Sequence, residues 1–146
     1  MNTNQNINKE LPFSPSNEIY KQTEWPDQLD ALIASPQHHR LLFENEFVRV
    51  LDTNIPPGEI THVHTHKYSA SLYFLSWSDF IRYDEKGNVL VDSRTLPKIP
   101  AVGSALWSGP LAAHSLKNIG DTHLHVISVE IKKLTNAETQ PILLET

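Results

Sequence analysis

Three histidines lie two residues apart, at His62, His64 and His66, shortly after a Pro-Pro-Gly sequence. The prolines disfavour a helix at this point, and Val63 and Thr65 between the histidines favour a strand. Side chains two positions apart on a strand leave the same face, so the three imidazoles are expected to point the same way. Because neutral imidazole is a common metal ligand, this strand predicts one half of a metal site.

The composition limits the kinds of site and partner that the chain supports. Its 146 residues are enough for one domain, with 39% hydrophobic residues and a net charge of −5. It has no cysteine, so any metal is held by nitrogen and oxygen, and eight histidines supply the nitrogen. The charge argues against a nucleic-acid partner, and no apolar run reaches the roughly 20 residues that cross a membrane. A polar start without signal-peptide features leads us to expect a cytoplasmic protein.

The histidines lie within a succession of predicted short strands. From residue 40 to residue 133, apolar and β-branched segments alternate with turns, including a hairpin signal at residues 84–88. Many short strands at this spacing are typical of an antiparallel sandwich or barrel, so the fold class is predicted to be all-β. We expect the barrel domain over residues 37–135 and a C-terminal tail over residues 136–146.

The segment before the barrel is predicted to be an arm with one short helix. Residues 1–36 begin with a polar, Asn-rich stretch that is expected to be poorly ordered on its own. A short helix is expected further along, with Asp27 as its cap and Pro36 as its end. Its expected apolar stripe is Leu29, Leu32 and Ile33.

Two sequence motifs in the predicted barrel resemble those of the cupin superfamily. The first consists of glycine, five residues, histidine, one residue and histidine, which Gly58, His64 and His66 match. The second ends in histidine, three residues and asparagine, which His114 and Asn118 match. The two motifs occur in the right order and at a suitable separation, which supports the fold that the resemblance implies. The resemblance says less about the chemistry, because one fold hosts many functions.

The resemblance covers residues 41–133 and is closest to the small single-domain cupins. It implies a double-stranded β-helix, also called a jelly-roll barrel, that forms a homodimer. It also implies that His114 joins His64 and His66 as ligands of one divalent metal ion. Iron, manganese, nickel, copper and zinc all suit such nitrogen ligands. The glutamate of the first motif is missing, because alanine or serine stands at its position, so we expect three histidine ligands and no carboxylate.

His62 is a further candidate for the same pocket. It shares the expected strand face of His64, one pleat earlier, and is open to three interpretations: a fourth ligand, an acid–base group or an exposed residue at the rim. The remaining histidines, His38, His39 and His123, have no such argument and are expected on the surface or in loops.

His125 is a candidate through a predicted hairpin. If residues 119–120 form a two-residue loop, His125 lies opposite His114, and opposed residues share a face. His125 is then either a pocket residue or a core histidine bonded to the backbone. The same register predicts that the inner face of the last strand also carries Ile127, Val129 and Ile131.

The leading functional hypothesis is a metal-binding cupin that acts on a small molecule. The likeliest enzyme class is a three-histidine iron(II) dioxygenase or a related oxidoreductase. One alternative is a metal-dependent lyase or isomerase with His62 or His125 as its base, and another is a non-catalytic ligand-binding protein. We expect Leu72 and Phe74 to form an apolar wall of the pocket, and the polar groups that orient a substrate to be Tyr68 and Arg82.

Overall fold

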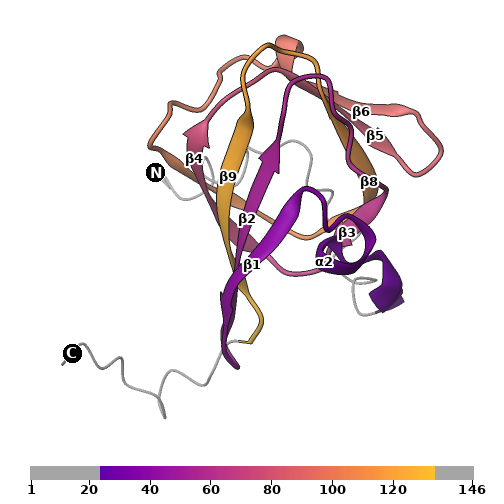
Figure 1. Ribbon diagram of the computed structural model, residues 1–146, viewed down its shortest axis with the longest axis vertical. Coiled ribbons are helices and arrows are strands. Elements are labelled where there is room, and N and C mark those ends of the chain that lie inside the picture. The colour runs from indigo at the N-terminus through magenta and orange to yellow at the C-terminus, as the bar shows by residue number, and fades with distance from the viewer. Residues whose placement is uncertain (1–23, 134–146) are drawn as a thin grey trace, which may run out of the picture.

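The computed structural model describes residues 24–133 (Figure 1). Most of the expected arm and the whole of the expected tail lie outside these residues. The described strands are β1 (His39–Glu44), β2 (Val48–Ile55), β3 (His64–His66), β4 (Ala70–Ser76), β5 (Phe80–Asp84), β6 (Val89–Asp92), β7 (Ala105–Ser108), β8 (Leu111–Asn118) and β9 (Leu124–Ile131). The described helices are η2 (Asp27–Leu29), α2 (Ala31–Ala34) and η3 (Ser93–Thr95). The predicted all-β class is therefore confirmed.

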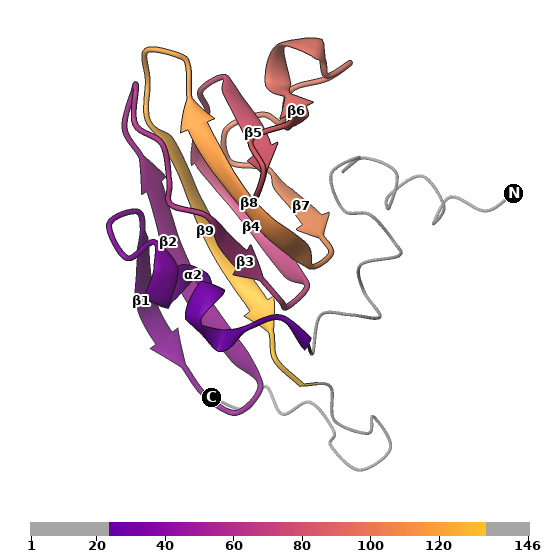
Figure 2. The same ribbon diagram turned by 90° about the vertical axis from the view of Figure 1, so that its right-hand side faces the viewer.

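The strands form two antiparallel sheets that lie face to face (Figure 2). The five-stranded sheet has the order β1-β2-β9-β4-β7, and the four-stranded sheet has the order β3-β8-β5-β6. Apart from the pairs β1–β2 and β5–β6, strands that follow each other in sequence lie in different sheets, so the chain crosses repeatedly between the two layers. A cluster of buried side chains from both sheets forms the hydrophobic core: Ile55, Phe74, Phe80, Val91, Leu124 and Val126.

The connection between β8 and β9 is one of these crossings, and the expected hairpin at residues 119–120 is wrong. Strand β8 pairs with β3 and β5, whereas β9 pairs with β2 and β4. Asn118 is fully buried and holds the crossing, because its Nδ2 donates to the carbonyl of Ile55 at 2.8 Å. Gly120 passes so close to Ser78 that an added Cβ would collide with the serine hydroxyl. A turn signal in the sequence does not tell whether the chain stays in one sheet.

The faces of β9 are consequently the reverse of those predicted. Side chains alternate along a strand, and the buried ones are Leu124, Val126, Ser128 and Glu130. The residues predicted to face inward are only half-buried: His125, Ile127, Val129 and Ile131. The polar Ser128 and Glu130 therefore face the interior, which brings a carboxylate into the barrel.

The predicted helix is shorter than expected and begins later. Asp30, rather than Asp27, caps α2. The carboxylate of Asp30 accepts a hydrogen bond from the backbone N–H of Leu32 at 3.1 Å. The extended backbone of Asp30 separates the turn η2 from α2, so the apolar stripe is rotated: Ala31 is buried and Ile33 is exposed. The helix ends before Pro36, as predicted. Within residues 24–133, no helix has the length and apolar character needed to span a membrane.

Strand β1 lies at an edge of the five-stranded sheet and carries exposed apolar side chains. Leu41 and Leu42 are each 42% exposed, and Phe43 is 49% exposed. An edge strand with apolar side chains is a common place for two chains to associate. The expected homodimer stays a prediction, and β1 is the surface on which to look for it.

Candidate metal centre and its cavity

The three histidines predicted as ligands lie together inside the barrel. His64 and His66 come from β3, and the pairing of β3 with β8 places His64 directly opposite His114. The ring centroids are 4.4 Å apart for His64 and His114, 4.9 Å for His64 and His66, and 5.6 Å for His66 and His114. His64 and His114 are almost completely buried. Two strands far apart in sequence thus bring three imidazoles to one point.

A fourth histidine, His39, joins this cluster and was not predicted. It is the first residue of β1 and is only 4% exposed, so the expectation of a surface or loop position is wrong. Its ring centroid lies 4.6 Å from that of His64 and 5.3 Å from that of His66. One ligand atom from each of His39, His64 and His66 lies within 4.8 Å of the others. His38 is buried too, beside Glu59, whereas His123 is exposed as expected.

Hydrogen bonds fix which ring nitrogen of each histidine faces the others. The Nδ1 atoms of three rings each lie 2.7–2.9 Å from a backbone carbonyl, which can only accept: His39 with Ser35, His64 with His62, and His114 with Ala112. Each of these Nδ1 atoms therefore carries the proton, and each Nε2 keeps its lone pair. Metal-binding histidines are typically held in this way, with the second nitrogen donating to an oxygen.

The Nε2 atoms of His64 and His66 face each other at 3.2 Å. Two lone pairs at this distance repel each other unless a cation, either a proton or a metal ion, lies between them. A metal bound to two imidazole nitrogens at about 2.0–2.1 Å holds them about 2.9–3.4 Å apart, for angles between the octahedral and tetrahedral values. The observed spacing fits a bound divalent metal without rearrangement.

Burial lowers the pKa of three histidines of the centre, His39, His64 and His114, and so keeps them neutral. It lowers the pKa of His39 to about 3, with the nearby His66 acting in the same direction. Burial also lowers the pKa of His64 well below its usual range, and the neighbouring rings of His114 and His66 lower it further. The pKa of His114 is lowered by burial and then by the positive charge of Arg82. Neutral imidazole is the form that binds a metal.

A buried series of charged side chains holds the ring of His66, the remaining histidine of the centre. Glu130 is 1% exposed, and its Oε2 lies 3.4 Å from Nδ1 of His66. Its Oε1 accepts a hydrogen bond from Nε of Arg49 at 2.8 Å, and the same guanidinium donates to both oxygens of Asp30. Burial alone would lower the pKa of Arg49, but the hydrogen bonds and charges of Asp30 and Glu130 outweigh it and raise that pKa. The cap of α2 is thus connected to the metal centre.

Glu130 also stands beside the position of the missing motif glutamate. Ala70 of β4 pairs directly with Glu130 of β9, and both side chains are buried and line the same cavity. A carboxylate therefore reaches the centre from the neighbouring strand, although none was expected. The signal for it in the sequence is a single acidic residue within the last strand, most of whose other residues are apolar.

The two residues predicted as catalytic do not line the cavity. His62 is exposed and precedes β3, so it does not share a strand face with His64; its backbone carbonyl accepts the Nδ1 hydrogen bond of that residue. His125 points to the other side of β9, where its Nε2 lies 2.7 Å from Oδ1 of Asp52. Because β8 and β9 belong to different sheets, the expected pairing of His125 with His114 is wrong.

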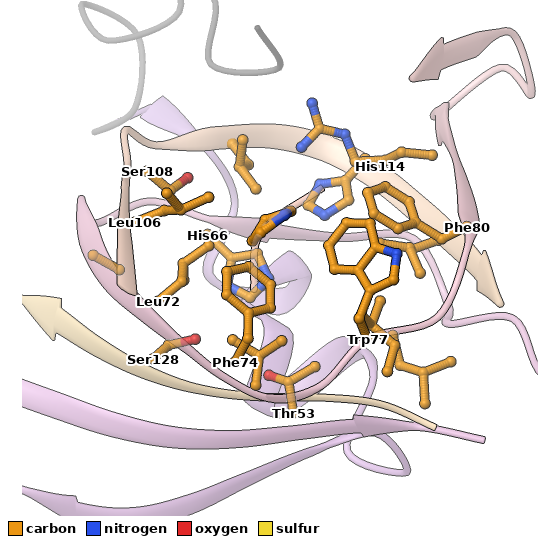
Figure 3. A pocket seen from close by; sticks show the side chains of 18 of the residues that line it. Thr53, His66, Leu72, Phe74, Trp77, Phe80, Leu106, Ser108, His114 and Ser128 are labelled. Atoms are coloured by element: carbon orange, nitrogen blue, oxygen red, sulfur yellow. The ribbon is translucent and has the colours of Figure 1, made fainter. Parts of the chain in front are cut away.

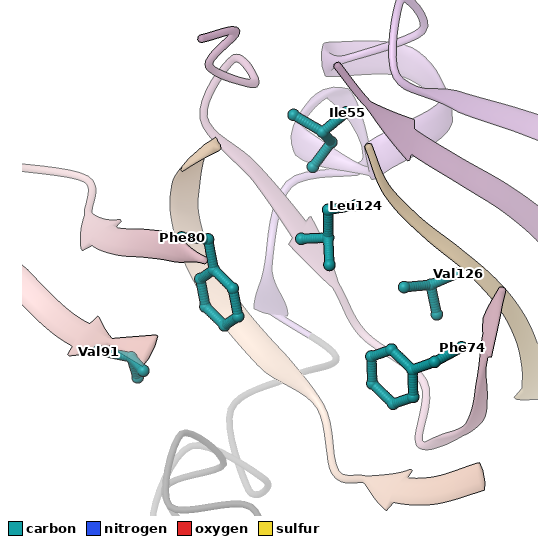
Figure 4. Close-up of a cluster of buried hydrophobic side chains, with 6 residues drawn as sticks. All are labelled: Ile55, Phe74, Phe80, Val91, Leu124 and Val126. Atoms are coloured by element: carbon teal, nitrogen blue, oxygen red, sulfur yellow. The ribbon is translucent and has the colours of Figure 1, made fainter. Parts of the chain in front are cut away.

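The histidines line one part of a cavity of about 710 Å³ between the two sheets. Figure 3 shows Phe74 and Trp77 pointing into the same space as His66 and His114. The predicted wall residues Leu72 and Phe74 line this cavity, as do Tyr68 and Arg82. Its far part merges with the hydrophobic core, whose side chains converge from both sheets (Figure 4). The cavity therefore combines a polar centre with an apolar chamber.

Comparison with known proteins identifies the fold. No protein-family model matches the sequence, and no curated protein matches it. A solved cupin domain from Bordetella pertussis Tohama I is similar in structure, with 21% sequence identity and a TM-score of 0.52, over 65% of this chain and 92% of that chain. A protein with a double-stranded β-helix domain from Klebsiella pneumoniae is more distant, at 17% identity and a TM-score of 0.45, over 64% of this chain and 75% of that chain. The chain has the double-stranded β-helix fold of the cupins, as its motifs predicted.

Proposed function

We propose that this cupin binds one divalent transition metal through Nε2 of His39, His64 and His66, and uses it to act on a small organic molecule in the adjacent cavity. The observation that carries the proposal is the direction of the rings: Nδ1 of each lies near an oxygen, and the Nε2 atoms are left to converge. Packing alone does not explain why several buried imidazoles would share this arrangement. His114, whose ring adjoins those of His64 and His66, is the fourth nitrogen beside this set.

The residues around the centre support a role in chemistry rather than in structure alone. Structural zinc sites are closed by four protein ligands, whereas a catalytic metal needs an open position beside a cavity. Here the histidines border a chamber with apolar walls, among them Leu72, Phe74 and Trp77, which would shield a bound molecule from water. Glu130 and the backbone carbonyls hold the rings in place, so the donor atoms need little rearrangement when a metal binds.

The reaction class that we favour is a dioxygenase-type oxidation. Iron(II) in a centre of nitrogen ligands would supply the redox chemistry that dioxygen requires. A lyase or isomerase needs a general base within reach of the substrate, and the two histidines suggested for that role, His62 and His125, are absent from the cavity lining. A non-catalytic binding protein is the remaining alternative.

Metal analysis tests the proposal directly. Protein purified without a metal-affinity column is expected to hold about one divalent metal per chain, or to take one up from iron(II), manganese, nickel, copper or zinc salts. His64→Ala and His66→Ala should abolish this uptake, and His39→Ala should weaken it strongly. His123→Ala is the matched control, because that ring lies on the exposed surface.

Oxygen uptake then separates the reaction classes. The iron-loaded protein is mixed with a panel of small carboxylic acids and diketones, and dioxygen consumption is followed with an electrode. Consumption that needs both the metal and one of these compounds supports the dioxygenase class. A protein that takes up no metal, or whose metal uptake is unchanged by His64→Ala, contradicts the proposal.

A further inference from the structure

A buried arginine lies beside the metal centre. Arg82 of β5 is 5% exposed and lines the cavity. In the pairing of β5 with β8, Arg82 is opposite Leu116 and Asp84 is opposite His114. Residues two apart on a strand share a face, so the side chains of Arg82 and His114 are diagonal neighbours inside the barrel.

The guanidinium of Arg82 is suited to binding an anion in this chamber. A buried cation is costly unless an anion or several hydrogen bonds accompany it. Burial lowers the pKa of Arg82 to about 9, so the group is still mainly charged at neutral pH. A guanidinium has five N–H donors and binds a carboxylate through two of them, which leaves donors for contacts within the protein.

The balance of charge around the cavity favours an anion as well. The acidic residue among the lining side chains is Glu130, and its charge is already matched by the hydrogen-bonded Arg49. Arg82 and a divalent metal at the histidines would both attract a negative group. Lys98 is a further cation of the lining, so Glu130 is outnumbered by positively charged side chains around the cavity.

Most of the remaining lining is apolar, although hydroxyl groups such as those of Thr53 and Ser108 also border the cavity. Its walls include Leu72, Phe74, Trp77, Leu106, Leu116 and Val126. A volume of about 710 Å³ lies within the range of roughly 300–1,000 Å³ that is typical of small-molecule pockets. Burying an apolar group against such walls contributes to binding in proportion to its area. A ligand that suits both parts has one charged end and one apolar body.

We propose that the cavity binds an organic monocarboxylate, with its carboxylate on Arg82 beside His114 and its aliphatic or aromatic body in the apolar chamber. This inference deepens the proposed function and rests on it, since it names the class of molecule that the metal centre would act on. It assigns Arg82 as a residue that determines specificity for acids over neutral analogues.

Paired probes test the inference on the wild-type protein. Binding of octanoate and of 3-phenylpropionate is compared with binding of 1-octanol and of 3-phenylpropanol. The two methods are calorimetry and tryptophan fluorescence, to which Trp77 in the cavity wall contributes. Each acid is expected to bind about tenfold to a hundredfold more tightly than its alcohol, because a charged hydrogen bond is lost in the alcohol. Equal affinities for acid and alcohol would overturn the inference.

Variants assign the preference to Arg82. Arg82→Gln should remove most of the acid preference while the alcohols bind as before, and Arg82→Lys should retain part of it. Arg94→Gln is the matched control, because that exposed arginine pairs with Asp92 outside the cavity. An acid preference that survives in a folded Arg82→Gln protein would also overturn the inference. The comparison of probes in the wild type does not depend on the folding of any variant.

Metal-free protein separates the failure of this inference from failure of the proposed function. Each titration is run on chelator-treated and on metal-loaded protein. If the protein binds a metal but shows no acid preference, the inference fails and the metal function stands. If the acid preference is present in a protein that takes up no metal, the proposed function fails and the carboxylate site stands.

Discussion

Two hydrogen-bonded series of side chains, each made of a histidine, a carboxylate and an arginine, lie on opposite faces of the five-stranded sheet. We call them the inner chain and the outer chain, and only the inner chain reaches the candidate metal centre. The inner chain is His66, Glu130 and Arg49, and the outer chain is His125, Asp52 and Arg40. The same three kinds of group are used in both. Successive side chains along β2 and β9 point to opposite faces of the sheet. Whether a residue belongs to the inner or the outer chain therefore depends on its position along the strand.

The two chains differ in the ring nitrogen that they engage and in their access to water. His66 presents Nδ1 to Glu130, which leaves Nε2 facing His64, whereas His125 engages Asp52 through Nε2. The side chain of Glu130 is 1% exposed, but that of Arg40 in the outer chain is 72% exposed. The two histidine side chains are similarly buried, at 18% exposed for His66 and 27% for His125. We conclude that the sheet face and the ring nitrogen that is engaged, rather than the residue types, distinguish His66, which we propose as a metal ligand, from His125.

The largest difference is expected when the arginine of each chain is removed. Arg49→Met leaves Glu130 and Asp30 as buried charges without their partner, and should lower the free energy of unfolding by about 3–5 kcal/mol. Arg40→Met removes a surface ion pair and should cost about 0–1 kcal/mol. Urea unfolding of both variants measures the difference. Similar losses in the two variants would show that the inner chain is not a buried unit.

A smaller effect is expected when each carboxylate is made neutral. Glu130→Gln keeps the shape of the side chain but weakens its hold on His66, and should reduce metal affinity about 10- to 100-fold. Asp52→Asn changes the outer chain in the same way and should leave metal affinity unchanged. Competition with a chromogenic chelator measures both. A loss of affinity that is equal in the two variants would contradict the assignment of Glu130 as a residue that positions a ligand.

The pH dependence of stability sharpens the contrast between the inside and the outside of the sheet. His39 takes up a proton near pH 6.5 when unfolded but only near pH 3 when folded, so the unfolded state binds more protons between these values. Stability of the metal-free protein is therefore complete above about pH 6.5 and falls as the pH is lowered through this window, by about 1.4 kcal/mol per pH unit for this residue. His39→Gln should flatten the slope by that amount in chemical unfolding at several pH values. An unchanged slope would contradict the burial of a neutral His39.

The smallest effect is expected for the outer histidine. His125→Ala breaks a half-exposed pair with Asp52 and should change stability by less than about 1 kcal/mol. Metal affinity and any metal-dependent activity should stay within about twofold of the wild type, because His125 does not line the cavity. If activity fell as far as in His66→Ala, the catalytic role predicted for His125 from the sequence would be restored.

The sequence predicts the fold and part of the centre, and the reasons for the misses are physical. The short strands and the two motifs are local patterns, which is why the all-β barrel and the grouping of His64, His66 and His114 were found. His39 is 25 residues before His64, and nothing in its local pattern indicates that β1 begins beside β3. Only the three-dimensional arrangement shows that proximity.

Glu130 was missed for a different reason, the choice of strand pairing. Reading residues 119–120 as a hairpin places β8 beside β9 and inverts every side chain of the last strand. That pairing places the carboxylate of Glu130 towards solvent and the ring of His125 towards the pocket. A sequence turn is compatible with either arrangement, because the sheet crossing held by Asn118 depends on contacts with Ile55 and Ser78, far away in the chain.

The most direct test is diffraction from crystals of the metal-loaded protein, measured at the absorption edge of the bound metal. We expect one strong anomalous peak per chain, about 2.0–2.1 Å from the Nε2 atoms of His64 and His66 and within bonding distance of Nε2 of His39. A peak on the outer face beside His125, or no peak within the barrel, would contradict the proposed metal site.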